Sequence, residues 1–386
     1  MSVYILGGAR TPQGSFLGSL STVTAPKLGA VAIEGALEKT DIDKNKVDEV
    51  YMGNVVQAGV GQAPARQASI FAGLPDSTQC TTINKVCGSG LQSIILGAKS
   101  ILTKDAKLVV AGGMENMSLA PHLLPNSRVG AKFGATSMKD SMQWDGLWDV
   151  YSDRPMGNCA EECTKKYELS REAQDEFSIR SFKRAQAAQE EGIFKSEISP
   201  VVIKTRKGET IVDSDEGPSK VRFDKVPTLR PAFDKNGTIT AANASTINDG
   251  ACALVLGGEE YKDQAKFKVL SWAGHAGEPT WFTTAPVEAI KKNLEKSNLN
   301  ISDIDLWEIN EAFAAVTMVA MKELQLDEEK VNIYGGGVSL GHPIGTSGAR
   351  IVLSLTNAME RKNAKIGCAA ICIGGGEALS IIIERL

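Results

Sequence analysis

The sequence predicts an α/β protein built from strands that helices cover on both faces. Short apolar runs alternate with helix-like stretches, namely VYILGG (3–8), DEVYMGNV (48–55), KLVVAGG (107–113), CALVLGG (252–258), IDLWEIN (304–310) and KIGCAAICIGGG (365–376). Such near-continuous apolar runs are typical of strands buried on both faces. The alternation favours α/β layers over a helical bundle or a β-sandwich. An internal similarity and a polar insertion refine this fold class.

Two distant stretches of the chain share a plan. LVVAGGMENM (108–117) resembles AAICIGGGEA (369–378), an apolar strand followed by glycines and a glutamate. Upstream of each, a glycine-rich turn leads into an apolar helix, NKVCGSGLQSIILGAKSIL in one case and SLGHPIGTSGARIVLSLTNAM in the other. The similarity indicates a duplicated fold. Strand–glycine–helix units also recur in unrelated α/β proteins, so this observation alone leaves the duplication open.

Residues 117–242 are more polar and contain few strand-like runs. Their clearest element is a helix that opens at Ser170, a favoured N-cap type, and continues through REAQDEFSIRSFKRAQAAQEE to Gly192. We interpret this region as an inserted loop domain. The predicted organisation is a first half at 1–116 plus 243–266, a loop domain at 117–242 and a second half at 267–386.

Composition and charge narrow the classes of function. The net charge is -4, so nothing indicates a general attraction to nucleic acid or to anionic membranes. The start, MSVYILGGARTPQGSF, lacks the plan of a signal peptide, and the longest apolar runs are too short and glycine-rich to cross a bilayer. We therefore expect a cytoplasmic protein. The odd count of seven cysteines argues against a disulfide framework. Two pairs of cysteines are spaced four apart, Cys159 with Cys163 and Cys368 with Cys372, but none of the three histidines lies beside either pair, which argues against a zinc site.

Cys87 is the first candidate catalytic residue, in the turn NKVCGSGLQSI directly before an apolar helix. A thiol at a helix N-terminus faces unpaired amide N–H groups and the positive end of the helix dipole, which favour thiolate. Gly88 and Gly90 permit close backbone approach. A nucleophile here could use its own N–H to stabilise an oxyanion. The alternative is a small, buried, apolar cysteine.

His342 lies in YGGGVSLGHPIGTSGAR, between Gly341 and Pro343. So much glycine around one imidazole indicates a backbone shaped to present the ring. A neutral imidazole beside a thiol is a suitable activating base. A lone histidine in such a loop can also be structural, so the pattern by itself leaves both interpretations open.

Two more candidates end predicted strands. Cys372 meets Gly374, Gly375 and Gly376, a turn that frees amide N–H groups to bind negative charge. A thiolate suits removal of a weakly acidic carbon-bound proton, although a cysteine packed in the core explains the position equally well. Asn310, in LWEINEAFAAV, is either the N-cap of the next helix or an amide that fixes a water or a substrate oxygen.

Together these motifs resemble the thiolase family. NKVCGSG is similar to its nucleophile motif, INEAF to its Asn-Glu-Ala-Phe motif, GHPIGTSGAR to its histidine motif and CIGGGEA to its second-cysteine motif, in the family's order. The similarity runs from ARTPQGSFLGSL to the last strand. It implies a thiolase fold, two duplicated α/β halves in a five-layered α-β-α-β-α arrangement with the inserted loop domain. It also implies a homotetramer, a dimer of dimers.

The resemblance further implies a reaction, the reversible Claisen condensation of two acetyl-CoA to acetoacetyl-CoA plus CoA, with CoA esters as substrates and no cofactor. In the family's mechanism His342 takes the proton of Cys87, which attacks the thioester and becomes acyl-Cys87. Cys372 removes a methyl proton from a second acetyl-CoA, and His342 and a water positioned by Asn310 hold the enolate oxygen. The N–H groups of Cys87 and Gly374 stabilise the tetrahedral oxyanion.

CoA needs a local binding surface, because the chain is acidic overall. Lys220, Arg222 and Lys225 precede RPAF and are charge-based candidates for the CoA phosphates, with a solvated basic face as the alternative. Pro155 stands where many short-chain members have histidine, so any imidazole contact there is missing. Family similarity places seven residues along the pantetheine arm: Leu147, Met156, Phe233, Ala241, Ser245, Ala312 and Phe313.

Within the family, DGLWDVYSDRPMGNCAEE and the AANAST run are most similar to the potassium-responsive acetoacetyl-CoA thiolases. This similarity implies potassium as an activator near Tyr151, Ala242, Ala244 and Val338. Two alternatives stay open. One is a broader-range 3-ketoacyl-CoA thiolase of fatty-acid degradation, which CIGGGEA fits. The other is a non-catalytic acyl-CoA-binding member, which would be expected to lack one of the four catalytic side chains.

Overall fold

The computed structural model describes residues 2–206 and 208–386, and its centre is a ten-stranded sheet. All six apolar runs named above lie in this sheet, as predicted. Its strands are β1 Val3–Arg10, β2 Gly14–Ser15, β3 Glu49–Gly53, β4 Gln79–Ile83, β5 Leu108–Asn116, β12 Asn248–Gly257, β13 Phe267–Ala276, β14 Leu306–Ile309, β15 Ile366–Ile373 and β16 Glu377–Arg385. Their order is β14-β15-β16-β13-β1-β12-β5-β3-β4, and β2 pairs with β12.

The sheet consists of two halves with the same strand order and directions. In the first, β1–β12 and β12–β5 are antiparallel, whereas β5–β3 and β3–β4 are parallel. In the second, β13–β16 and β16–β15 are antiparallel and β15–β14 is parallel, and a parallel bridge from Trp307 to Val331 replaces the last strand pair. β5 and β15, which carry the two similar sequence stretches, hold equivalent places. The predicted duplication is therefore confirmed.

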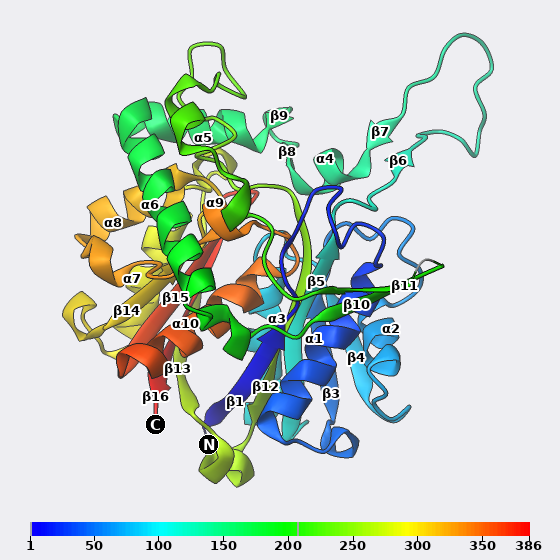
Figure 1. The fold of residues 1–386 in the computed structure, drawn as a ribbon, viewed down its shortest axis with the longest axis vertical. Coiled ribbons are helices and arrows are strands. Elements are labelled where there is room, and N and C mark those ends of the chain that lie inside the picture. Colours follow the sequence, from blue (N-terminus) through cyan, green and yellow to red (C-terminus); the bar gives the residue numbers. More distant parts are fainter. Residues whose placement is uncertain (1, 207) are drawn as a thin grey trace.

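Helices form three layers around the two halves of the sheet (Figure 1). α3 and α10 form the middle layer and pack against each other, α1 and α2 cover the outer face of the first half, and α7 and α8 that of the second. The apolar core is divided in the same way, with one large cluster in each layer. The helix bounds are α1 Ala25–Thr40, α2 Pro64–Phe71, α3 Ser89–Thr103, α7 Ala285–Ser297, α8 Ala314–Leu324, α9 Gly337–Leu340 and α10 Ser347–Lys362.

The starts of α3 and α10 touch through two glycines. A Cβ on Gly90 would lie 2.7 Å from the backbone N of Ala349, and one on Gly348 would lie 2.4 Å from the backbone N of Leu91. Cβ atoms do not approach backbone so closely, so only glycine permits this reciprocal contact. The segment Val86–Thr103 is long and apolar enough to span a membrane by composition, yet it consists of α3 and the turn before it, and 61% of that window is buried.

Between β5 and β12 the chain leaves the first half, with α4 and α5 at one end of the molecule and α6, β10 and β11 running across its face (Figure 1). The predicted N-cap is confirmed, since Ser170 Oγ accepts a hydrogen bond from Ala173 N at 3.1 Å. The loop between β6 and β7 projects outward, with Phe133 fully exposed. The elements here are β6 His122–Leu123, β7 Lys139–Asp140, α4 Ser141–Gly146, β8 Trp148–Asp149, β9 Arg154–Pro155, α5 Met156–Lys166, α6 Arg171–Glu190, β10 Val201–Thr205 and β11 Gly208–Val212. Short 3-10 helices span Lys44–Lys46, Ile193–Ser196, Pro218–Lys220, Phe223–Thr228, Glu259–Gln264, Pro279–Trp281, Ile301–Asp303 and Glu328–Lys330.

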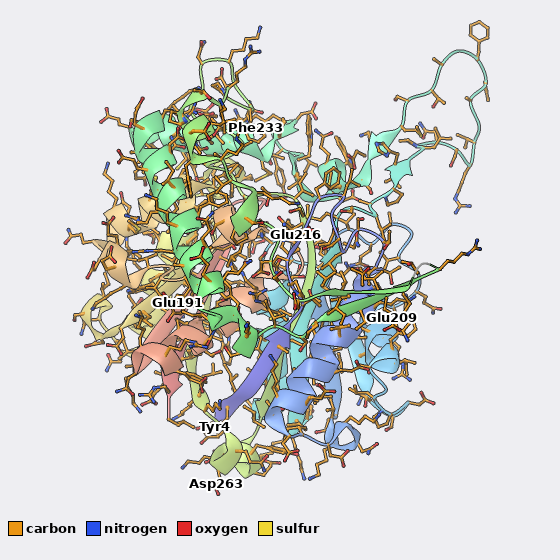
Figure 2. All side chains as sticks on the ribbon, viewed as in Figure 1. Tyr4, Glu191, Glu209, Glu216, Phe233 and Asp263 are labelled. Carbon is orange, nitrogen blue, oxygen red and sulfur yellow. The ribbon has the colours of Figure 1, made fainter. Side chains whose placement is uncertain are left out.

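A buried ionic cluster fastens this region to β1. Arg10 is fully buried and donates to Glu197 Oε1 at 2.7 Å and to the two carboxylate oxygens of Asp215 at 2.7 and 2.8 Å. Such paired geometry offsets the cost of burying the charge. The neighbouring Glu216, labelled in Figure 2 between Phe233 and Tyr4, accepts from Ser15 N at 2.6 Å. The segment that leads to the basic residues is thereby placed against the end of β1.

Candidate active site

Cys87 lies immediately before α3, in a tight and strained turn. Val86 has a φ of 45°, a left-handed conformation that is rare for a β-branched residue. Ser89 braces the turn, since its hydroxyl donates to Val86 O at 2.6 Å and accepts from Lys85 N at 2.8 Å. Cys87 is half-buried, and the other cysteines are buried apart from Cys80 on β4. The turn therefore places this partly exposed residue at the start of the middle helix.

The two candidate cysteines lie together. Burial raises the pKa of Cys87 to about 11, while hydrogen bonds from the backbone N–H groups of Gly374 and of Cys87 itself act to lower it. Cys372, fully buried at the end of β15, has its pKa raised by burial and further by negative charge on Cys87. A Cβ on Gly88 would lie 2.4 Å from Ile373 Cδ1, so glycine allows the turn to approach the end of β15. Both thiols are therefore protonated in the ligand-free protein at neutral pH.

His342 is held in a buried turn just before α10. Its backbone N donates to Thr246 O at 3.3 Å and to Asn248 Oδ1 at 3.2 Å. The preceding Gly341 has a φ of 101°, and a Cβ there would lie 2.3 Å from Asn248, so this turn requires glycine. Glycine shapes this turn as expected, but the prediction that the turn presents the ring rather than burying it is wrong, because His342 is only 5% exposed.

The hydrogen bonds of His342 indicate which ring nitrogen carries the proton. Nδ1 lies 2.5 Å from Ser347 Oγ, and that hydroxyl donates to Pro343 O at 3.0 Å. Because the hydroxyl proton is used there, Nδ1–H is the donor to Ser347, and Nε2 keeps its lone pair. Nε2 is buried without a hydrogen-bond partner among the described residues. Burial, and to a lesser degree the charge of Arg350, lower the pKa of His342 to about 3. The ring is a neutral base with Nε2 free.

Asn310 is fully buried at the end of β14. Its backbone N donates to Ala370 O at 2.9 Å, and Oδ1 accepts from Arg350 Nη2 at 3.4 Å. The interpretation of Asn310 as a helix N-cap is wrong, because α8 begins at Ala314 and Phe313 holds the cap position. The short turn from residue 310 to residue 313 separates strand from helix, which leaves the Asn310 amide free for another role.

Two buried residues that sequence reasoning missed hold the turns of the site. Glu115 accepts from Val55 N at 3.0 Å, Val56 N at 3.1 Å and Gly345 N at 2.9 Å, so it ties the loop after β3 to the His342 turn. Asn248, besides its contact with His342, donates to Gly14 O at 2.9 Å. The glutamate in the repeated GGMEN stretch was a usable signal for Glu115. Asn248 had no such signal, because its contacts with Gly14 and His342 join remote segments.

The three basic candidates for CoA phosphates lie on one cavity. Lys220, Arg222 and Lys225 line a cavity of about 300 Å³, together with Ala241 from the predicted pantetheine set. Each cation has a carboxylate nearby, Glu216 at 3.8 Å for Lys220 and Asp224 at 3.4 and 3.7 Å for the other two, and all three are more than half exposed. Such exposed pairs are weak, so the cations stay available to a phosphate.

The other predicted pantetheine residues form two apolar groups, one beside each thiol. Met156, Phe233, Ala312 and Phe313 pack in the cluster that contains Cys372. Figure 2 labels Phe233 near α5. Leu147 belongs to the cluster that borders Cys87, and its O accepts from Met156 N at 3.0 Å. Ser245 N donates to Ala312 O at 3.0 Å, and Pro155 holds the N-cap position of α5.

The four residues implied for potassium lie on a cavity, at a β-bridge and at an exposed position. Ala242 and Val338 line the 300 Å³ cavity, and Ala244 forms an isolated β-bridge with Phe313. Tyr151 is 73% exposed and lies beside Gly375. Potassium near these residues stays a prediction from the family resemblance, and no step of the reaction is routed through the ion.

Comparison with known proteins places these observations in a family. The model "Thiolase, N-terminal domain" matches residues 3–260, and the model "Thiolase, C-terminal domain" matches residues 263–385. An acetyl-CoA acetyltransferase of Schizosaccharomyces pombe is 49% identical, with 100% of this chain and 99% of that protein covered. The crystal structure of the Bacillus anthracis acetyl-CoA acetyltransferase superposes with a TM-score of 0.97 at 39% identity over 100% of this chain and 99% of the other. The crystal structure of the Acat5 thiolase from Ascaris suum in complex with coenzyme A superposes with a TM-score of 0.94 at 44% identity, and both chains are fully covered.

Proposed function

Because the chain belongs to the thiolase family, it is an acyltransferase that acts on CoA thioesters, and we propose that Cys87 carries the acetyl group. The protein is an acetyl-CoA acetyltransferase, which joins two acetyl-CoA into acetoacetyl-CoA plus CoA or runs the reverse thiolysis. The observation that carries the assignment of Cys87 is its position, half-buried at the start of α3 with the Gly374 N–H on its sulfur.

The first half-reaction forms the acetyl-enzyme. His342 Nε2 takes the Cys87 proton as the sulfur attacks the thioester carbonyl, and the departing CoA thiolate receives that proton from the imidazolium. The backbone N–H groups of Cys87 and Gly374 hold the oxyanion, and each such donor is worth roughly 3 kcal/mol in related chemistry. A neutral thiol beside a neutral imidazole fits this step, because the proton moves only while charge develops on the substrate.

The second half-reaction forms the carbon–carbon bond. Cys372 passes its proton to His342 and, as a thiolate, removes a methyl proton from a second acetyl-CoA. Its pKa, raised by burial, makes it a strong base once deprotonated. The enolate carbon attacks acetyl-Cys87, and Cys87 leaves as a thiolate that His342 reprotonates. The enolate oxygen is held by His342 and by a water bound to Asn310.

Cys372→Ala separates the two half-reactions. The variant is expected to form acetyl-Cys87 at nearly the normal rate, seen as a mass increase of one acetyl group, and to lose condensation by at least about 100-fold. Equal loss of both half-reactions would contradict this division of labour.

A broader-range 3-ketoacyl-CoA thiolase is the second candidate. Two aromatic rings in the apolar cluster of Cys372 favour short acyl groups: Phe282 is buried, Phe313 is partly buried, and their ring centroids lie 6.1 Å apart, edge to face. A chain-length series of 3-ketoacyl-CoA esters with free CoA tests this point. We expect the rate to be highest with acetoacetyl-CoA, and a maximum at eight carbons or more would overturn the short-chain assignment.

We also propose a cytoplasmic homotetramer. The family resemblance supports the assembly, as do the exposed apolar residues Val129, Phe133 and Met138 on the loop between β6 and β7. Relatives with similar identity carry both cytosolic and mitochondrial names, so these names do not distinguish the two compartments. Light scattering of the purified protein tests the assembly, and imaging of the full chain tests the location.

A further inference from the structure

Arg350 is a buried cation that the proposed mechanism leaves unused. It lies near the start of α10 and is 1% exposed. A buried charge is costly unless it is paired. Its Nη2 donates to Asn310 Oδ1 at 3.4 Å, and its Nη1 lies 3.8 Å from Glu308 Oε2. Arg350 thus connects the asparagine of the site to a buried carboxylate on β14.

The contact with Arg350 determines which atom of the Asn310 amide, the oxygen or the nitrogen, lies beside the guanidinium. A guanidinium only donates hydrogen bonds, so the amide atom beside it must be the oxygen. The Nδ2 group then points the other way, and it is buried without a hydrogen-bond partner among the described residues. An unsatisfied buried amide donor is rare in folded proteins and calls for an explanation. A ligand or a water in the site would supply the missing acceptor.

Glu308 lies beside the buried guanidinium and does not compete for Asn310. Its side chain is 3% exposed, and the long contact to Nη1 is an ion pair rather than a hydrogen bond. Arg350 Nη1 and Glu308 Oε2 have no hydrogen-bond partner among the described residues. Burial raises the pKa of Glu308 to about 8, and the charge of Arg350 opposes that rise. Among the described residues, the hydrogen bond from the guanidinium to a neighbouring side chain goes to Asn310.

We propose that Arg350 is a positioning residue that holds the Asn310 amide with its Nδ2–H directed at the oxygen of the acetyl thioester being enolised, directly or through one water. This rests on the proposed function, because the enolate forms only in the second half-reaction. No bond to Arg350 forms or breaks. Without the guanidinium, the amide can rotate and present its oxygen, an acceptor, to a developing negative charge.

Arg350→Gln tests the proposal and has a natural reference, since Gln92 occupies the corresponding position in α3, three residues after the first helical serine. Condensation of preformed acetyl-Cys87 with acetyl-CoA is expected to fall about 10- to 100-fold, because one donor to the enolate oxygen is misdirected. Formation of acetyl-Cys87 at pH 8, where His342 is neutral with or without the arginine, is expected to change less than about threefold. Arg350→Lys, which keeps a cationic donor, should recover part of the condensation rate.

A double-mutant cycle separates positioning from general damage. If Arg350 acts through Asn310, the condensation rate of the double variant Asn310→Ala/Arg350→Gln should lie within about threefold of the rate of Asn310→Ala alone. If Arg350→Gln does not fold, the double variant Glu308→Gln/Arg350→Gln is used instead, because it also removes the carboxyl group beside the guanidinium. Its condensation rate is then compared with that of Glu308→Gln.

The matched control is Arg361→Gln, on the same helix. Its guanidinium donates to the Asn357 amide oxygen at 3.1 Å, away from the site, so neither half-reaction should change. Equal losses in both half-reactions of Arg350→Gln, or multiplicative losses in the cycle, would overturn the positioning role. A wild-type chain that never forms acetyl-Cys87 would instead overturn the proposed function.

Discussion

The turns that lead into α3 and α10 have the same framework and different chemistry. Each helix begins with a serine whose hydroxyl donates to a carbonyl of the preceding turn, Ser89 to Val86 O at 2.6 Å and Ser347 to Pro343 O at 3.0 Å. Each serine also meets a second polar group in its own turn. The duplicated halves therefore supply two equivalent, facing helix N-termini.

What differs is the side chain that each turn presents. Counted back from the helical serine, Cys87 corresponds to Gly345, and His342 corresponds to Asn84. One turn thus carries the nucleophile and a small polar residue, and the other carries the base and a glycine. Neither half holds a complete site. The two turns therefore share a duplicated backbone plan, whereas the catalytic side chains are divided between them, a cysteine in one half and a histidine in the other.

The largest effect is expected from removing the nucleophile from the first turn. Cys87→Ala should lower acetyl transfer by at least about 1000-fold, since loss of a covalent nucleophile removes the intermediate. Mass spectrometry after mixing with acetyl-CoA measures the acetyl-enzyme directly. Cys80→Ala is the matched control, because Cys80 is the other cysteine that is not fully buried. Acetylation that persists in Cys87→Ala would break the assignment of roles to the two turns.

A moderate effect is expected at the glycines through which the turns meet. Gly348→Ala and Gly90→Ala should each lower the free energy of unfolding by about 1–3 kcal/mol, because the added methyl group forces the helices apart. Gly348→Ala should be the worse, since its Cβ would lie 2.4 Å from backbone nitrogen against 2.7 Å for Gly90. Thermal unfolding of the two variants shows which of them is less stable. Unchanged stability of both would mean that the contact between the helix starts is not tight.

The smallest effect is expected from pH. Because the pKa of His342 is lowered to about 3, the imidazole stays neutral and acetyl-Cys87 formation should change less than about twofold between pH 5 and pH 8. An ordinary histidine, with a pKa near 6.5, would lose about 30-fold over that interval. The sign for stability follows from the same shift: the neutral buried ring stabilises the fold above pH 6.5, and this contribution is lost as pH falls toward 3. If the rate of acetyl-Cys87 formation instead fell with a midpoint near pH 6.5, the imidazole of His342 would have to be exposed to water rather than buried.

Much of the fold could be predicted because periodicity and glycine placement act locally. The six apolar runs became strands, and Ser170 capped its helix, since both depend on neighbours in the chain. The join between the halves could not be predicted, because β1 meets β13 through three residues, Val3 to Ile5, that carry no distinctive pattern. Similarly, the N-cap interpretation of Asn310 was wrong because a turn of three residues intervenes before α8.

By itself, the sequence determined which side chains could do chemistry, since Cys87, His342, Cys372 and Asn310 each stand in a glycine-rich turn or at a strand end. Only the tertiary structure decided how they act. The tautomer of His342 depends on Ser347, the facing of the Asn310 amide depends on Arg350, and the proximity of the two thiols depends on the contact between the halves. The physical reason is that a proton's position and a hydrogen bond's direction are set by neighbours in space, and burial makes those neighbours decisive.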